Sequence, residues 1–395
     1  MENKEIKHLI ISKRLIKINS LLVAIIISAN ILAIAINLIT GLNNTVIIPF
    51  IVCSLISFVI NRKQNLVIVI PLSLFFLIYF LLSYLQIGAS PHWKDYLMSF
   101  FAFGITSFIV TSQPFEVKKI MKYITLIYVF TSWIFLFLDL ENMLPGNKMG
   151  LGYLILPVIL VCIYQLFYIK IKSSQKLYYF IIIVWYGYFM MKVGTRGAFL
   201  SIGLYIFLLF VITKKITINR IIIYLLGLGT LIFVYTNILP LLLVARNLLE
   251  NLNIKSNFIE KSVLLIEGNN VFNGRDILYE SAFNGFKESW FYGKGIGFFH
   301  DHYGTYIHNI FLQMLNESGV LLIIPFVFLI LYCIFLLFLS KKIDQSFKLF
   351  ICFIFSLAIP KLIVSSIYWK EQGFWILIIM IISFKMFKNY RFSKV

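Results

Sequence analysis

The sequence predicts an all-α, polytopic integral membrane protein with about twelve transmembrane helices. Hydrophobic residues make up 61% of the 395 positions and charged residues only 13%, and the mean hydropathy is +0.92. Soluble domains are roughly 45–50% apolar and about 25% charged. A chain with so few polar residues cannot cover cores of this size in water, so we expect most of it to lie in a membrane.

Long apolar runs give the expected helices in order. A helix needs about 20 mostly apolar residues to cross a bilayer. Such runs lie at residues 18–40, 44–60, 66–88, 96–112, 119–138, 150–169, 177–193, 197–213, 220–243, 319–340, 347–368 and 373–388. The first run follows a basic segment and has no cleavage site after a short core, so we expect it to remain as a signal anchor.

One segment is too long to be a simple loop. We therefore divide the chain into residues 1–243 with helices 1–9, a large loop at 244–318, and residues 319–395 with helices 10–12 and a C-terminal tail. Apolar residues in the loop fall at helical spacing in two stretches: Leu278, Ala282, Phe283 and Phe286, then Ile310, Phe311, Met314 and Leu315. We expect the loop to form a small helical cap on the outer surface of the membrane.

The distribution of charge predicts the orientation. The formal net charge is +19. With both termini in the cytoplasm, the inner segments hold 23 Lys and Arg against 4 acidic residues, and the outer segments hold 12 of each. Cytoplasmic loops retain basic residues, so this orientation is favoured and the 244–318 loop lies outside. The positive excess faces anionic lipid, which removes the reason to expect a nucleic-acid partner.

Several kinds of chemistry lack their motifs. The sequence has no Walker loop, no dinucleotide-binding fingerprint, no HExxH and no Asp-x-Asp. The four cysteines lie inside apolar runs without the spacing of a disulfide framework or a zinc site. We therefore expect no cofactor and no metal, and we disfavour chemistry that uses ATP or a nucleotide sugar.

Histidines gather in the large loop, where His300, His302 and His308 lie within nine residues. His300 and His302 flank Asp301, which leaves open a metal site or simply solvated loop histidines at the lipid headgroups. His308 precedes Asn309 and an apolar helical pattern, so its imidazole is expected at the start of a helix near the membrane boundary.

Two arginines are candidates for binding an anion. Arg196 lies in a short outer link between two apolar runs, where it either contacts lipid phosphate or lines a pocket for an anionic group. Arg275 could join the same pocket, or it could pair with Asp276 or Glu280 on the loop helix. Lys361 and Arg246 are expected to extend toward the headgroups.

Five short motifs occur in a familiar order. They are Gly194-Thr195-Arg196-Gly197-Ala198, Gly274-Arg275 with Tyr279, Gly295-Ile296-Gly297, His308-Asn309-x-x-Leu312 and Glu317-x-Gly319. Between about residues 180 and 340 the chain thus resembles the O-antigen ligase and polymerase family of bacterial envelope glycosyltransferases. Tyr279 stands where that family often has Trp.

The resemblance implies a membrane glycosyltransferase of the bacterial plasma membrane, with its active site on the extracytoplasmic side. Such an enzyme moves a glycan from a polyprenyl-pyrophosphate lipid to a sugar hydroxyl, without metal and with inversion. Arg196 and Arg275 would stabilise the departing pyrophosphate, and His308 would be the general base. The residues implied to bind substrate are Arg196, Arg275, His300, His302, Asn309, Tyr279 and Glu317. Partners would be the lipid-linked donor and acceptor, membrane lipid, and a chain-length regulator and flippase of the same pathway.

Two other functions stay open. A ligase would hand a finished glycan to a different acceptor. We prefer a polymerase of capsule or O-antigen repeat units, because abundant Ile, Lys and Asn suggest an AT-rich genome, which is common in Gram-positive bacteria that make capsules. A flippase or other transporter of lipid-linked glycans is less favoured, because the helix centres are nearly free of charge and the long loop lies in only one half.

Overall fold

The computed structural model describes residues 2–41, 45–137, 148–213, 237–252, 256–268, 275–340 and 343–383. Within these ranges every regular element is a helix, as the sequence predicts. The chain forms two compact units, one made of residues 1–138 and 277–395 and the other of residues 139–276.

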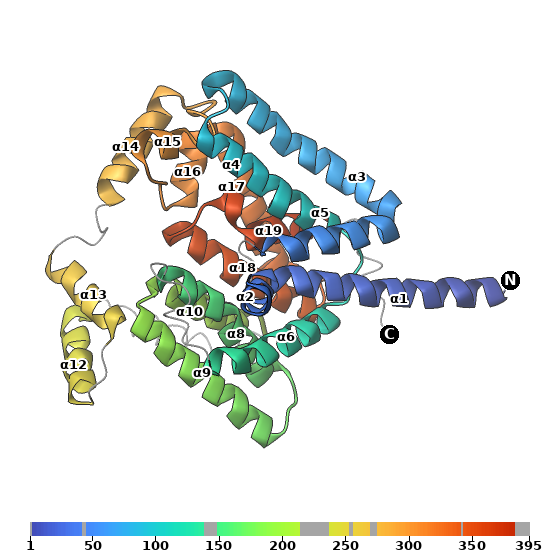
Figure 1. The fold of residues 1–395 in the computed structure, drawn as a ribbon, viewed down its shortest axis with the longest axis horizontal. Coiled ribbons are helices and arrows are strands. Elements are labelled where there is room, and N and C mark those ends of the chain that lie inside the picture. Colours follow the sequence, from blue (N-terminus) through green and yellow to red (C-terminus); the bar gives the residue numbers. More distant parts are fainter. Residues whose placement is uncertain are drawn as a thin grey trace. The chain divides into compact units, whose positions relative to one another are not determined.

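Helices of the first unit come from both ends of the chain (Figure 1). They are α1 (Glu2–Ile27), α2 (Ala29–Thr40), α3 (Ile47–Ile87), α4 (Pro91–Ser99), the π-helix η1 (Phe100–Ile105), α5 (Thr106–Thr111), α6 (Val117–Phe137), α14 (Arg275–Glu288), α15 (Phe298–Tyr303), α16 (Ile310–Ser318), α17 (Val320–Ile334), the π-helix η2 (Phe335–Leu339), α18 (Gln345–Val364), the 3-10 helix η3 (Tyr368–Lys370) and α19 (Gln372–Ser383). The first two residues of α14 belong to the second unit, which also contains α8 (Lys148–Tyr168), α9 (Ser173–Val193), α10 (Arg196–Thr213), α12 (Ile238–Asn251) and α13 (Asn257–Glu267).

Four helical segments in the described ranges are long and apolar enough to cross a membrane: 66–87, 150–168, 320–339 and 345–364. A fifth is added if the bent pair α1 and α2 counts as one span. Helices lie where most of the twelve spans were expected, but only these four or five meet the length and composition of a span. Most of the expected ninth span, 220–243, lies outside the described residues.

The first expected span, 18–40, is in fact two helices. The axes of α1 and α2 differ by 69° at Ser28. The carbonyl of Ile27 accepts hydrogen bonds from the Tyr128 hydroxyl at 3.2 Å and from the Gln372 side chain at 3.1 Å. Because side chains from other helices satisfy this carbonyl, the backbone can leave the helical ladder here without an unpaired polar group.

The second and third expected spans are joined. Residues 61–65 were expected to be a polar loop, but α3 continues through them with a kink at Asn61 (φ −121°, ψ 28°). The Asn61 amide donates to the Asn19 side chain at 2.9 Å and to the Ser57 carbonyl at 3.3 Å. These bonds satisfy the polar side chain at the kink.

An aromatic cluster forms the core beneath η3 in the first unit. Trp369 of η3 lies 4.6 Å from Phe80 and 5.7 Å from Trp375, measured between ring centroids. Trp375 in turn contacts Phe76 at 5.0 Å and Phe100 at 5.3 Å. Fully buried rings such as these each bury about 150–250 Å². Their packing joins α3, η1 and α19 to η3 and fixes its position.

Helices α14 and α16 lie where the apolar spacing at 278–286 and 310–315 predicts them. Ala282 of α14, Phe299 of α15 and Ile307 form a small buried core, with Leu278, Tyr279 and Leu312 packed against it. Helix α15 contacts both α16 and α4 (Figure 1). The three short helices therefore share one core, and α15 connects them to the start of α4.

In the second unit, α8 packs along α9, and the α9–α10 turn is fixed from two sides. A Cβ at Gly152 of α8 would overlap the Thr195 side chain, so α8 approaches the turn closely. On the other side, Asn257 donates to the Lys192 carbonyl at 2.6 Å. These contacts define where α10 begins, and its first residue is Arg196.

Candidate functional site

The first turn of α4 has clear start signals in the sequence. The Ser90 hydroxyl accepts a hydrogen bond from the Trp93 backbone at 3.2 Å and caps the helix. Pro91 occupies the first helical position, where its missing N–H costs nothing. Helix α4 therefore begins five residues before the expected start at 96, and His92 and Trp93 lie in its first turn.

A glycine allows α15 to approach this turn. Gly297 precedes α15 with φ +84°, a conformation that L side chains rarely adopt. A Cβ at this position would lie 2.9 Å from the Trp93 nitrogen and 3.1 Å from the His92 carbonyl carbon. The Gly295-Ile296-Gly297 motif thus brings the backbones of α4 and α15 together.

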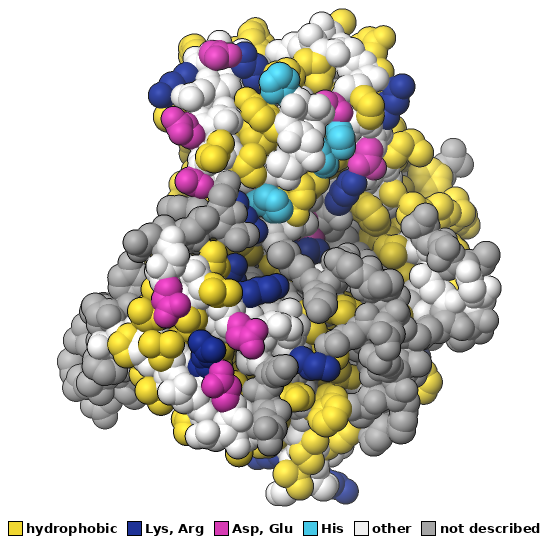
Figure 2. Space-filling view, turned by 60° about the vertical axis from the view of Figure 1, so that its left-hand side comes forward, with side chains coloured by type: hydrophobic (Ala, Val, Ile, Leu, Met, Phe, Trp, Pro, Cys, Tyr) yellow, Lys and Arg dark blue, Asp and Glu magenta, His cyan; other side chains and the backbone are white. Residues whose placement is uncertain are grey.

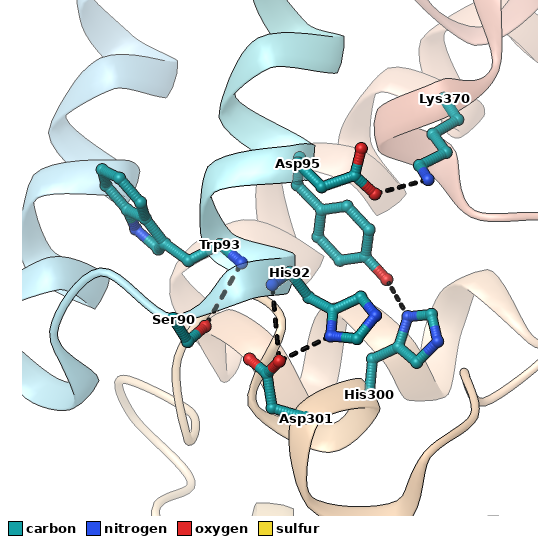
Figure 3. Close-up of polar contacts among 8 residues, drawn as sticks. Ser90, His92, Trp93, Asp95, His300, Asp301 and Lys370 are labelled. Atoms are coloured by element: carbon teal, nitrogen blue, oxygen red, sulfur yellow. Dashed lines mark hydrogen bonds and ion pairs between the residues drawn. The ribbon is translucent and has the colours of Figure 1, made fainter.

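His92 and Asp301 meet at this contact (Figure 3). The Nδ1 atom of His92 lies 2.5 Å from the Asp301 Oδ1 atom, and the His92 backbone N–H donates to the same oxygen at 3.3 Å. Burial alone would raise the pKa of the Asp301 carboxyl, but hydrogen bonds from Ser90 and His92 hold that pKa below its usual value. An ionised carboxylate only accepts, so His92 Nδ1 carries the proton and Nε2 presents the lone pair.

A second imidazole stacks on the first. The rings of His92 and His300 are 3.6 Å apart between centroids with 23° between their planes. The Tyr96 hydroxyl lies 2.8 Å from His300 Nδ1. Burial, followed by the charges of His92 and Lys370, lowers the pKa of His300, so this imidazole is neutral at pH 7.

Charged residues surround the imidazole pair. Lys370 of η3 forms an ion pair with Asp95 at 2.5 Å, and its ammonium also lies 5.8 Å from the centre of the Tyr96 ring. Burial is the main cause that raises the pKa of Tyr96, and the carboxylates of Glu317, Asp95 and Asp301 act in the same direction. Histidine side chains reach the molecular surface among acidic and basic side chains (Figure 2).

His308 lies at the start of α16, as the sequence predicts. Asn309 caps the helix by accepting from the backbone N–H groups of Phe311 and Leu312 at 3.0 and 3.2 Å. His308 has φ +60°, the only positive φ of a non-glycine residue in the described ranges. Its ring lies 3.9 Å from the ring of Tyr306, whose hydroxyl donates to the Ser365 carbonyl at 2.9 Å. The local conformation is thus strained and supported by neighbouring contacts.

Glu317 is buried rather than open to a ligand, with 4% of its surface exposed. One carboxylate oxygen accepts from the Tyr368 hydroxyl at 2.6 Å and from Trp369 Nε1 at 2.9 Å, and the other from the Gln313 amide at 2.9 Å. Burial raises the pKa of Glu317, and these bonds together with the Gly297 N–H oppose that shift. Glu317 thus links α16 and η3 to the turn before α15.

Arg196 and Arg275 both lie in the second unit, each at the first position of a helix. Burial, and then the positive charge of Arg275, lowers the pKa of Arg196. Two guanidinium groups from segments 79 positions apart are therefore close enough for their charges to interact. Gly274, which precedes Arg275, lies outside the described residues.

The remaining predicted residues lie around the α14–α16 core. Tyr279 packs against that core. The exposed His302 stacks on Phe298, with 5.6 Å between ring centroids. His300, His302, His308, Asn309, Tyr279 and Glu317 all belong to the first unit, and the two arginines belong to the second. In the described ranges no group of three or more His, Cys, Asp or Glu side chains is arranged to hold a metal ion.

His92 and Tyr96 are not among the site residues that the sequence predicts. His92 lies between the expected spans 66–88 and 96–112, and Tyr96 is the first residue of the second span. Ser90-Pro91 is a recognisable start signal for a helix, and it could have placed His92 on an ordered first turn. The partner of His92 is 209 positions away, so the pairing itself has no local signal.

Comparisons with models of known protein families, with curated proteins and with solved structures found no match for this chain.

Proposed function

We propose that this protein is a bacterial membrane glycosyltransferase of the polysaccharide polymerase type. It transfers a glycan from a polyprenyl-pyrophosphate lipid to a sugar hydroxyl, on the outer face of the plasma membrane. The apolar helices support a membrane location, and the five short motifs support this reaction class.

The observation that carries the proposal is the pair of arginines. Burial and then the charge of Arg275 lower the pKa of Arg196, so the two guanidinium groups lie near enough to interact, and each would attract an anion bound beside them. A guanidinium binds phosphate oxygens through a planar fork and stays charged at any physiological pH. The departing group of a polyprenyl-pyrophosphate donor is such an anion, and Arg196 and Arg275 would stabilise it as the glycosidic bond breaks.

The attacking hydroxyl needs a group that accepts its proton. Neutral imidazole suits this task near pH 7 and typically contributes about 10²–10⁴-fold to the rate. The resemblance favours His308 for this role, with His300, His302, Asn309 and Tyr279 as residues that bind substrate. Glu317, which the resemblance places in the same set, is buried by its bonds to Tyr368, Trp369 and Gln313 and would hold α16 and η3 in place. The donor brings its own leaving group, so the proposed reaction uses neither ATP nor a nucleotide sugar.

A reconstituted reaction tests the proposal. The purified full chain in lipid vesicles is given a polyprenyl-pyrophosphate oligosaccharide in the presence of a chelator, and product lengths are measured. A ladder of longer lipid-linked glycans supports a polymerase, and one addition to an unrelated acceptor indicates a ligase instead. Movement of the intact donor across the bilayer without any new glycosidic bond would contradict the proposal.

A further inference from the structure

Four histidines lie on or beside α4, α15 and α16: His92, His300, His302 and His308. His300 is half-buried, stacked on another imidazole and near the ammonium of Lys370, so a positive charge on it is disfavoured. His308 lies just before α16, and its ring centroid is 3.9 Å from that of Tyr306. The exposed His302 stacks on Phe298.

His92 is the histidine with a carboxylate partner. Asp301 binds its Nδ1 at 2.5 Å, which fixes the tautomer with the lone pair on Nε2 and supplies a counter-charge for the protonated ring. The side chains of His92 and Asp301 are 30% and 23% exposed, so substrate can reach the imidazole. The stacked His300 ring and the Gly297 contact restrict its movement.

We infer that His92, and not His308, is the catalytic base, and that Asp301 is its positioning residue. This inference rests on the proposed function. The acceptor hydroxyl oxygen forms a bond to the anomeric carbon of the donor, and the bond from that carbon to the pyrophosphate oxygen breaks. The hydroxyl proton moves to His92 Nε2 and then to water, and the pyrophosphate leaves with the bonding electron pair. His308, beside Tyr306, then contacts substrate without accepting this proton.

The turnover rate of the His92→Gln variant tests this inference separately from the proposed function. Gln keeps a polar side chain but accepts no proton at neutral pH, so kcat should fall about 10²-fold or more with KM for the acceptor little changed. Added imidazole should restore part of the rate of His92→Ala. Asp301→Asn should lower kcat and shift the acidic limb of the pH profile, and Asp301→Glu should recover part of the activity.

Lys94→Gln is the matched control, because Lys94 is an exposed residue on the same turn of α4. It should leave turnover unchanged. If the wild-type protein elongates glycan and His92→Gln does so within twofold of its rate, the inference is overturned while the proposed function stands. If the wild-type protein makes no glycosidic bond, the proposed function itself fails.

A chemical measurement tests the pair without turnover. Diethyl pyrocarbonate acylates deprotonated imidazole, and mass spectrometry reports the extent at each histidine. Asp301→Asn should slow the modification of His92 several-fold, because the lone pair on Nε2 is no longer fixed by a carboxylate. His302 is the internal standard and should react at the same rate in both proteins. Equal rates at His92 in the two proteins would overturn the inference.

Discussion

Gly297 lies against the backbone of Trp93 so closely that a Cβ at position 297 would be 2.9 Å from the Trp93 nitrogen. This close approach joins the start of α15 to the first turn of α4. Asp301 follows Gly297 by one helical turn and His92 precedes Trp93, so the paired side chains depend on this approach. The glycine is therefore a structural requirement of the candidate site rather than a flexible joint.

Replacing Gly297 with Ala should separate α4 from α15. The substitution adds a steric clash to a backbone with φ +84°, and the left-handed conformation alone costs a non-glycine residue about 1–2 kcal/mol. Gly304→Ala is the matched control, because Gly304 ends the same helix with φ +68° and a Cβ there would have no atom within 4 Å. Thermal unfolding in detergent should show a larger drop for Gly297→Ala. Equal drops would mean that the close contact with Trp93 contributes nothing.

Substitutions of Glu317 should destabilise the protein through lost hydrogen bonds. Glu317→Ala leaves the buried donors of Tyr368, Trp369 and Gln313 without an acceptor, and each such group costs about 1–3 kcal/mol. Glu317→Gln keeps one acceptor oxygen and should cost less. Glu288→Gln is the control, because that exposed carboxylate pairs only with Lys294 at the surface. In chemical denaturation, Glu317→Ala should lose the most stability and Glu317→Gln should lose less. Glu288→Gln should show no measurable change.

Local patterns account for the parts of the fold that the sequence predicted. The apolar spacing at Ile310 and Met314 correctly placed α16, and both side chains are buried. Asn309 directly before this pattern is a recognisable start signal, and it caps the helix in the structure. Such features depend on neighbours within a turn or two, which a sequence displays directly.

Features that depend on distant residues were not predicted. The break at Ser28 requires Tyr128 and Gln372 to bond the Ile27 carbonyl, and neither is near it in sequence. His92 is paired with the carboxylate of Asp301, which is 209 positions away in the sequence. The resemblance implies that Glu317 binds substrate, but its bonds to Tyr368 and Trp369 bury it. Tertiary contacts decided all three outcomes.

Stability should fall in mildly acidic solution because of His300. Its folded-state pKa lies below the ordinary value of 6.5, so unfolding takes up a proton at this histidine as the pH falls below that value. His300 therefore leaves stability unchanged well above its ordinary pKa, and it lowers stability as the pH falls below about 6.5. The charged groups that face it are His92, Lys370, Asp301 and Asp95.

Unfolding midpoints measured from pH 8 to pH 5 test this dependence. His300→Gln removes the titrating group, so its midpoint should vary less with pH than that of the wild type. Lys94→Gln should show the wild-type dependence. A His300→Gln curve parallel to the wild-type curve would show that another group is responsible.

Loss of either arginine of the proposed anion pair should reduce polymer formation while the protein stays in the membrane. Removing one charged donor from a transition-state contact typically costs about 10²–10³-fold in rate. Arg196→Lys keeps the charge but loses the planar fork, so its rate of polymer formation should lie between those of the wild type and Arg196→Ala.

If both guanidinium groups bind the same pyrophosphate, the fold-loss in rate of the double Ala variant should be smaller than the product of the two single fold-losses. Arg246→Lys is the control, because Arg246 pairs with Glu250 on exposed α12. Single variants that elongate glycan at the wild-type rate would remove both arginines from the mechanism.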